Sequence, residues 1–250
     1  ANAALWGGLL ATTYAVMQFL FGPLLGNLSD RFGRRPVLLV SLAGMALGHL
    51  AAALAGSIWM LLGARFLTGA MAATNATAGA FIADISAPEQ KAARFGLIGA
   101  AFGVGFVLGP ALGGLLGELG PRAPFWAAAV LAGLNLAFGA VVLPETLPAE
   151  SRRRFAWARA NPLGALADIA PRPEIWPLVL MLFFYEFAFT AYSAVWAFFT
   201  QARFGWTAAQ VGGSLAAFGV GMVVVQGALI RPVLARLGER RTALWALAFN

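Results

Sequence analysis

Seven long apolar runs dominate this 250-residue sequence. They lie at residues 5–25, 37–55, 59–83, 95–117, 124–143, 175–198 and 207–230, and another begins at residue 242. A helix of about 20 apolar residues crosses the hydrocarbon core of a bilayer, so each run is long enough to span it. Charged residues make up only 11% of the chain, whereas soluble domains carry about 25%. The sequence therefore predicts an all-α polytopic membrane protein.

The distribution of basic residues predicts the orientation of these helices. Four alternate connections hold 14 of the 17 Lys and Arg residues: 26–36, 84–94, 144–174 and 231–241. Because cytoplasmic loops carry the excess of basic residues, this set is placed in the cytoplasm of a multi-pass plasma-membrane protein. The bias accounts for the net charge of +7 without a nucleic-acid partner. Residues 152–154, all arginine, are interpreted as part of a solvated loop, with contact to anionic lipid headgroups as the alternative.

The longest connection, 144–174, predicts a cytoplasmic linker between two helical bundles, residues 1–143 and 175–250. An internal repeat supports two bundles, since residues 22–39 and 227–244 are identical at six of 18 positions. Both copies fall in connections on the same side, as expected for parallel repeats related by an axis along the membrane normal.

Cysteine is absent and histidine occurs once, at His49. This composition excludes a disulfide framework and makes a thiolate or zinc site untenable. A membrane-embedded enzyme would need a clustered nucleophile or metal site, which the sequence does not offer. We therefore expect no enzymatic activity, no metal site and no cofactor.

Three motifs resemble signatures of the major facilitator superfamily. Residues 26–35, GNLSDRFGRR, are similar to its cytoplasmic loop 2–3 signature, and residues 105–114, GFVLGPALGG, are similar to the fifth-helix signature of its drug:proton antiporters. Arg65 with Gly69 resembles the fourth-helix signature. The resemblance covers nearly the whole chain. It implies a twelve-helix fold of two pseudo-symmetric bundles, of which this chain would run from helix 2 to the start of helix 9, incomplete at both ends.

The chain resembles the tetracycline-efflux branch of the superfamily in particular. The segments that carry this resemblance are residues 29–39, 82–84 and 203–206. The resemblance implies proton-driven export of a small amphipathic, drug-like compound by alternating access, with a protein that works as a monomer. Tetracycline is one candidate and would be carried as a metal chelate. A proton symporter or facilitator for a nutrient is the alternative, and a non-transporting signalling protein is a more distant one.

The loop 2–3 signature implies a cytoplasmic gate made of Gly26, Asp30, Arg31, Gly33, Arg34 and Arg35. Asp30 can pair with the neighbouring guanidinium groups or place negative charge at a helix N-terminus. Loop charges that only set the orientation are the alternative. Asp84, at the cytoplasmic end of its helix, is expected to pair with Lys91 or Arg94, and Ser86 with Glu89 fits a capping box.

The antiporter signature comprises Gly105, Gly109, Pro110, Gly113 and Gly114. Glycines recurring every fourth residue form a bare stripe that permits close helix contact, and Pro110 removes one backbone hydrogen bond. The resemblance implies a hinge and seal here, and close packing without gating is the alternative.

Three ionisable residues inside the spans are candidates for proton coupling: Arg65, Glu186 and His49. Charge inside a bilayer is costly, so such groups should face a bundle interior or an aqueous cavity. The alternatives are a structural ion pair or a snorkelling side chain for Arg65, a neutral cavity-lining carboxyl for Glu186 and a buried, hydrogen-bonded imidazole for His49. Gly48 stands where the tetracycline-efflux pattern has a membrane aspartate.

Polar uncharged residues within the spans are candidates for a substrate cavity: Gln18, Thr74 and Asn75. Their side chains could instead hydrogen-bond to neighbouring helices.

Overall fold

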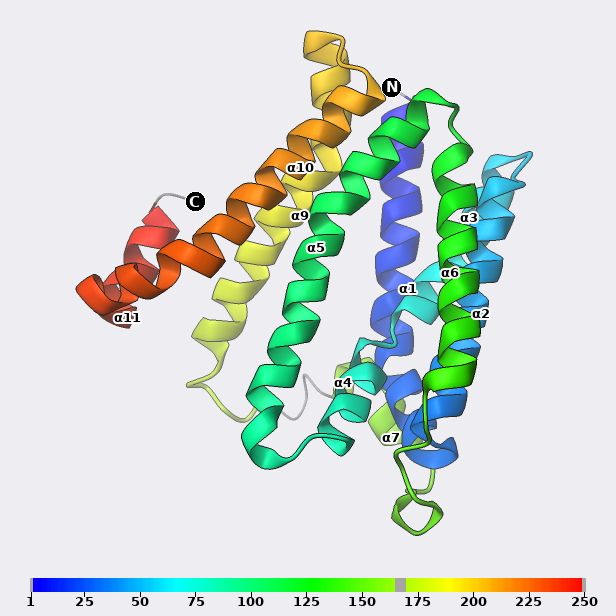
Figure 1. The fold of residues 1–250 in the computed structure, drawn as a ribbon, viewed down its shortest axis with the longest axis vertical. Helices are drawn as coiled ribbons and strands as arrows, with labels where there is room; N and C mark the ends of the chain where they lie inside the picture. The colour runs from blue at the N-terminus through cyan, green and yellow to red at the C-terminus, as the bar shows by residue number, and fades with distance from the viewer. Residues whose placement is uncertain (1, 165–169, 249–250) are drawn as a thin grey trace.

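The computed structural model describes residues 2–164 and 170–248, and the regular structure within them is helical (Figure 1). The long helices are α1 (Asn2–Phe32), α2 (Arg34–Ala53), α3 (Ile58–Ala72), α4 (Asn75–Asp84), α5 (Lys91–Glu118), α6 (Ala123–Val142), α9 (Trp176–Phe204), α10 (Ala208–Val224) and α11 (Ile230–Ala248). Short segments are the 3₁₀ turns Pro88–Gln90 and Ala149–Ser151, the helix α7 (Trp157–Ala160) and a π-helical turn Val225–Leu229. Each predicted apolar run forms helix, which confirms the all-α fold.

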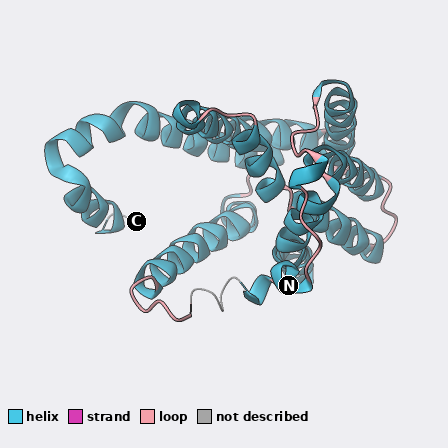
Figure 2. Ribbon diagram, turned by 90° about the horizontal axis from the view of Figure 1, so that it is seen from below, coloured by secondary structure: helices cyan, strands magenta, loops and turns pink. Residues whose placement is uncertain are grey.

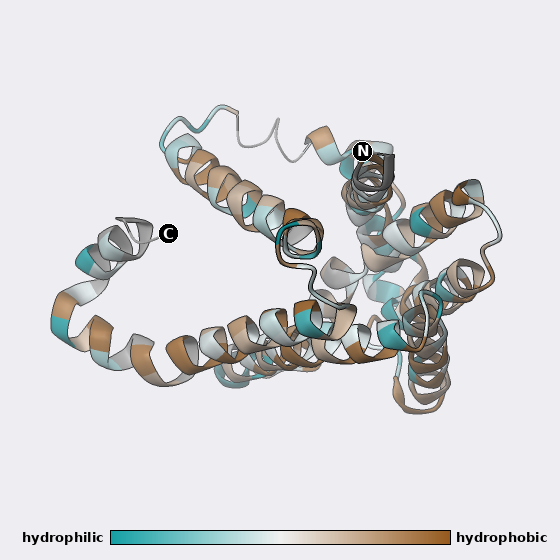
Figure 3. Cartoon of the chain, turned by 90° about the horizontal axis from the view of Figure 1, so that it is seen from above, coloured by the Kyte–Doolittle hydropathy of each residue, from teal (hydrophilic) through white to brown (hydrophobic). Residues whose placement is uncertain are grey.

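Six helical stretches of the described chain are long and apolar enough to cross a membrane, and α10, with 17 residues, is a shorter apolar helix. Figure 2, seen from below, shows these helices joined mostly by short loops. Large apolar side chains are exposed along them, with Val141 86% and Leu134 62% accessible. Figure 3 shows apolar residues recurring along the length of the helices. Lipid solvates such surfaces without the cost that water would impose.

The first connection differs from the predicted loop 26–36, because α1 continues to Phe32 and α2 begins at Arg34. Only Gly33 breaks the helix, with φ 106° and ψ 159°, a conformation that is essentially restricted to glycine. Gly238, its counterpart in the repeat, has φ 74° and ψ 164° and interrupts α11 in the same way. The repeat therefore extends from sequence to backbone conformation.

The run 59–83 forms two helices, α3 and α4, rather than one uninterrupted span. At the break, the hydroxyl of Thr74 donates to the carbonyl of Met71 at 3.3 Å. Side-chain hydrogen bonds of this kind compete with the helical backbone pattern and bend helices. The side chain of Thr74 therefore bonds to the backbone at the end of α3, the helix that precedes it.

Helix starts follow capping rules in part. Thr207 and Gln210 form a reciprocal capping box at the start of α10, which the T-x-x-Q spacing could have predicted. The capping box expected at Ser86 and Glu89 is wrong, since the 3₁₀ turn after Ala87 has no side-chain cap. Ser86 instead donates its hydroxyl back to the carbonyl of Ile82, at the end of α4.

Two groups of helices pack side by side. Helix α3 lies against α1 and α2, and α2 packs along α6, whereas α5 packs chiefly along α10 (Figure 1). Buried positions carry mostly small residues such as Ala53, Ser41 and Thr77, which let helices approach closely. Helix α5, expected in the first bundle, thus forms its main contact with a helix of the second.

The linker 144–174 is described up to residue 164 and again from residue 170. Its first part folds back on the end of α1, where Asn27 Nδ2 donates to the carbonyl of Ala156 at 2.6 Å and the backbone N–H of Arg153 donates to the carbonyl of Asp30 at 2.9 Å. This part is therefore attached to the first bundle rather than freely solvated.

Candidate functional site

Arg34 is the centre of a charge network at the predicted cytoplasmic end of the helices. Its guanidinium forms ion pairs with Asp30 at 2.6 Å and Asp84 at 3.3 Å. It also donates to the hydroxyl of Ser29 at 2.7 Å. The network joins the end of α1, the start of α2 and the end of α4, so one side chain ties three helices together.

The partner predicted for Asp84 is wrong. Its carboxylate binds Arg34 of α2 and accepts from the hydroxyl of Thr146 at 3.2 Å. Arg94 instead donates to the carbonyl of Ile85 at 2.8 Å and to Gln90. The local sequence favoured a neighbouring base, whereas helix packing brings a base from 50 residues away.

Glu145 adds further hydrogen bonds to this network, although no sequence motif had pointed to it. Its Oε1 accepts the backbone N–H groups of Arg34 at 2.8 Å and of Thr146 and Leu147 at 3.0 Å. Burial raises the pKa of Glu145, but hydrogen bonds from the N–H groups of Leu147, Arg34, Thr146 and Arg35 outweigh it and lower the pKa below its ordinary value. A lone acidic residue directly after an apolar run was the signal that could have identified it.

The other predicted gate residues lie around this network in different roles. Arg31 places its guanidinium 5.0 Å from the centroid of the Phe32 ring, and Arg35 donates to the carbonyl of Ala140 at 2.7 Å, at the end of α6. Gly26 lies within α1, and its carbonyl accepts from Ser29 at 2.8 Å. Of the six predicted residues, Asp30 and Arg34 meet directly, which supports the pairing expected for Asp30.

Arg65 lies beside a cavity of about 560 Å³ between α1, α3 and α9. Gln18 lines the same cavity, as its prediction required, together with Tyr14 and Thr190. The guanidinium lies 5.8 Å from the ring centroid of Phe125, a cation–π distance, and forms no ion pair within the described residues. The structural ion pair considered for Arg65 is therefore not found in this part of the chain.

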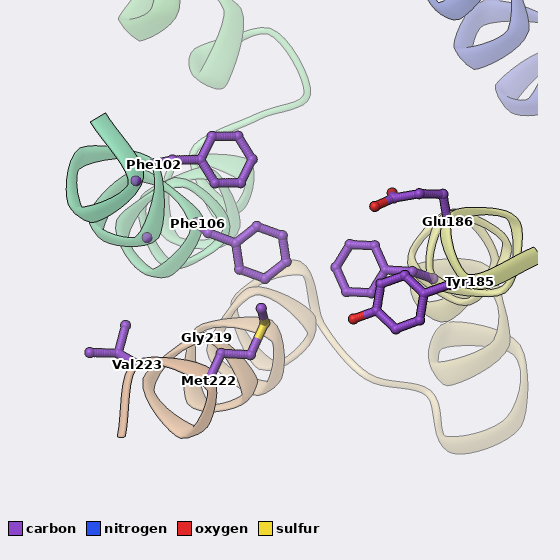
Figure 4. A pocket seen from close by; sticks show the side chains of 10 residues that line it. Phe102, Phe106, Tyr185, Glu186, Gly219, Met222 and Val223 are labelled. Carbon is purple, nitrogen blue, oxygen red and sulfur yellow. The ribbon is translucent and has the colours of Figure 1, made fainter. Parts of the chain in front are cut away.

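Glu186 faces a second cavity, of about 300 Å³, formed by α5, α9 and α10. Figure 4 shows its carboxylate and the rings of Phe102, Phe106 and Tyr185 directed toward the same space. Met222 of α10 lines the opposite wall (Figure 4). Among the described residues that line this cavity, Glu186 alone is charged. The cavity thus combines aromatic surface with one carboxyl group.

Helix α9 contributes to both cavities, because Thr190 follows Glu186 by one helical turn. The cavity beside Arg65 and the cavity beside Glu186 therefore share α9 as a wall. The structure does not bring Arg65 and Glu186 into an ion pair within the described residues.

His49 is half-buried on α2. At the adjacent Gly48, an added Cβ would lie 2.5 Å from Thr68 Cγ2, so α2 and α3 approach too closely there for a larger side chain. A larger side chain at this position would require α2 and α3 to move apart. The side chain of Asn75 lies outside the described residues.

The glycines of the antiporter signature do not act as one contact stripe. Gly105, Gly109 and Gly113 have open space around their Cα atoms, whereas a Cβ on Gly117, the next glycine at this four-residue spacing, would lie 3.1 Å from the Cβ of Ala208. A Cβ added to Gly114 would lie 2.6 Å from the carbonyl oxygen of Ala208 in α10. A Cβ added to Gly212 of α10 would overlap the carbonyl oxygen of Pro110 in α5. The close contact is real, but it lies on a neighbouring face of α5 and depends on Gly212, which was not predicted.

A family model described as "Major Facilitator Superfamily" matches residues 5–250. The chain belongs to the major facilitator superfamily. Its described part has six helical stretches long and apolar enough to cross a membrane, so it is a multi-pass membrane protein. The superfamily is a family of transporters and not of enzymes, as the sequence predicts. Its bacterial relatives fit a plasma-membrane location.

Curated relatives of this superfamily chain include tetracycline resistance proteins. The class C protein of Escherichia coli is 41% identical over 96% of this chain and 61% of its own length, and the class G protein of Vibrio anguillarum is 39% identical with the same coverage. A crystal structure of the human organic anion transporter MFSD10 (TETRAN) matches with a TM-score of 0.73 and 32% identity, over 94% of this chain and 58% of that protein. The chain thus spans about three fifths of the length of these relatives.

Proposed function

We propose that this superfamily member exports a small amphipathic, drug-like compound in exchange for protons, by alternating access between its two helical bundles. The relatives whose names state tetracycline resistance support export, and tetracycline is a candidate substrate. The energy comes from the proton gradient without a bound cofactor, and tetracycline would enter as a metal chelate. The full-length protein works as a monomer.

The observation that carries this proposal is the position of Glu186. A carboxylate inside a membrane-spanning helix is costly while ionised, so protonation and substrate binding compete to neutralise it. Its cavity is lined by α5 from one half of the sequence and by α9 and α10 from the other. A group at this boundary is placed to change its exposure as the two halves move relative to each other.

A second candidate function is transport of an organic anion. It is favoured by Arg65, whose guanidinium has no carboxylate partner within the described residues and borders a cavity of its own. The structurally similar human MFSD10 is an organic anion transporter by name. A proton-coupled symporter or facilitator of a nutrient acid would fit the same cavity.

The test uses everted membrane vesicles containing the full-length protein. Under a proton gradient we expect tetracycline accumulation that collapses with the gradient. Glu186→Gln should abolish this accumulation yet retain exchange of labelled for unlabelled tetracycline, which requires no net proton movement. Glu89→Gln, the same chemical change at an exposed position outside both cavities, is the matched control and should retain both activities. Accumulation that persists without the gradient, or in Glu186→Gln, would refute proton coupling through this residue.

A further inference from the structure

Four arginines surround a single cavity at the predicted cytoplasmic end of α1. Arg31 comes from the last turn of that helix, and the linker supplies Arg152, Arg153 and Arg154. With Phe155 they line a volume of about 460 Å³. The sequence separates Arg31 widely from the other three arginines, so only the folded linker makes them one site.

Backbone contacts hold this arrangement in place. The N–H of Arg153 donates to the carbonyl of Asp30 at 2.9 Å, directly beside Arg31, and the carbonyl of Arg154 accepts from the side chain of Arg159 at 2.8 Å. Asn27 anchors the nearby Ala156 to α1. Like charges are therefore held together by bonds that do not involve their guanidinium groups.

The positive charge of this cavity is not neutralised by ion pairs within the described residues. The ion pairs found there are formed by Arg34, which engages Asp30 and Asp84. Glu145 is engaged by backbone N–H groups. The guanidinium groups around the cavity thus retain donors in the fork geometry that suits a phosphate.

The cavity also lies where the apolar part of α1 ends. Phe32 is the last residue of the candidate span Leu5–Phe32, and Arg31 precedes it. Phe155 packs edge-on against Trp157 at 5.0 Å, and Trp157 is 78% exposed. Exposed aromatic residues next to basic residues are typical of the membrane–water interface, at the level of lipid headgroups.

We propose that the cavity formed by Arg31, Arg152, Arg153, Arg154 and Phe155 binds the headgroup phosphate of an anionic phospholipid in the cytoplasmic leaflet. The phosphate accepts hydrogen bonds from the guanidinium groups, and the aromatic residues lie against the acyl chains. Because the backbone N–H of Arg153 is bonded to the carbonyl of Asp30, the lipid site adjoins the network around Arg34.

Binding is tested on the full-length protein in a neutral detergent, with native mass spectrometry to count bound lipid. The probes are phosphatidylglycerol, phosphatidylcholine with the same acyl chains, and inorganic phosphate. We expect preferential binding of phosphatidylglycerol, weakened about fivefold by Arg152→Gln and about fivefold by Arg154→Gln. Arg172→Gln removes the same charge from the same linker outside the cavity and should leave binding unchanged.

Arg154→Lys keeps the charge and should retain most of the affinity, and an unchanged gel-filtration profile verifies that each variant is folded. Equal binding of the two lipids, or an Arg172→Gln effect as large as that of Arg154→Gln, would overturn the proposal. Full displacement of phosphatidylglycerol by millimolar inorganic phosphate would identify a site for free anions and overturn the assignment to a lipid.

Discussion

Gly33 and Glu145 show how single residues set the geometry of the charge network around Arg34. The positive φ of Gly33 turns the chain between α1 and α2 in one residue and exposes the N–H groups at the start of α2. The carboxylate of Glu145 then accepts from that helix start, where negative charge is favoured by the helix dipole. The turn and the carboxylate lie against each other, so each constrains the other.

Gly33→Ala should lower the stability of the protein by about 1–3 kcal/mol, because alanine is strained at φ 106° and its Cβ would overlap the Glu145 carboxylate. Gly26→Ala is the control, since Gly26 lies within a helix with open space around it. That substitution should be neutral or slightly stabilising. The measurement is thermal unfolding of the full-length protein in detergent, and equal midpoints for both variants would contradict the prediction.

The contribution of Glu145 to stability should depend on pH. Its folded-state pKa lies below the ordinary value of 4.5, so the stabilisation is present above about 4.5 and is lost as the pH falls through the lower, folded-state value. The difference in melting temperature between wild type and Glu145→Gln should therefore shrink as the pH falls from neutral to strongly acidic. A pH-independent difference between wild type and Glu145→Gln would exclude this mechanism.

At the scale of helices, sequence and structure agree where hydrophobicity decides. All seven apolar runs are helical because lipid leaves the backbone no other partner. The sequence could not predict which face of α5 makes contact, because every face carries small or apolar residues and periodicity gives no preference. Nor could it place Arg34 beside Asp84, a pairing that depends on how α2 lies against α4.

The contact between α5 and α10 should be sensitive to one methyl group. Gly212→Ala would push a Cβ into the carbonyl oxygen of Pro110, and backbone cannot move away as a flexible side chain can. We expect a loss of about 1–3 kcal/mol in the free energy of unfolding. The neighbouring Gly213→Ala meets open space and is the matched control. Equal unfolding curves in a detergent and dodecyl sulfate titration would show that this contact contributes nothing.

For the molecule as a whole, folding brings together charged residues that lie far apart in the sequence. The arginines of the first and third basic connections lie at one end of the helices, around the ends of α1 and α4. The turn between α5 and α6 lies at the opposite end (Figure 1). The division into bundles at residues 1–143 and 175–250 stays a prediction. Helix α5 of the first of these segments packs chiefly on α10 of the second.

The orientation can be tested with two engineered cysteines, because these 250 residues contain no natural one. Leu119→Cys, at an 80% exposed position after α5, should react with a membrane-impermeant maleimide added to intact cells. Ser151→Cys, exposed in the linker, should react only after the cells are permeabilised. This pattern follows from the excess of basic residues on the cytoplasmic side. The reverse pattern would place the arginine cavity, the Arg34 network and Glu145 outside the cell and would remove the basis for a cytoplasmic lipid site.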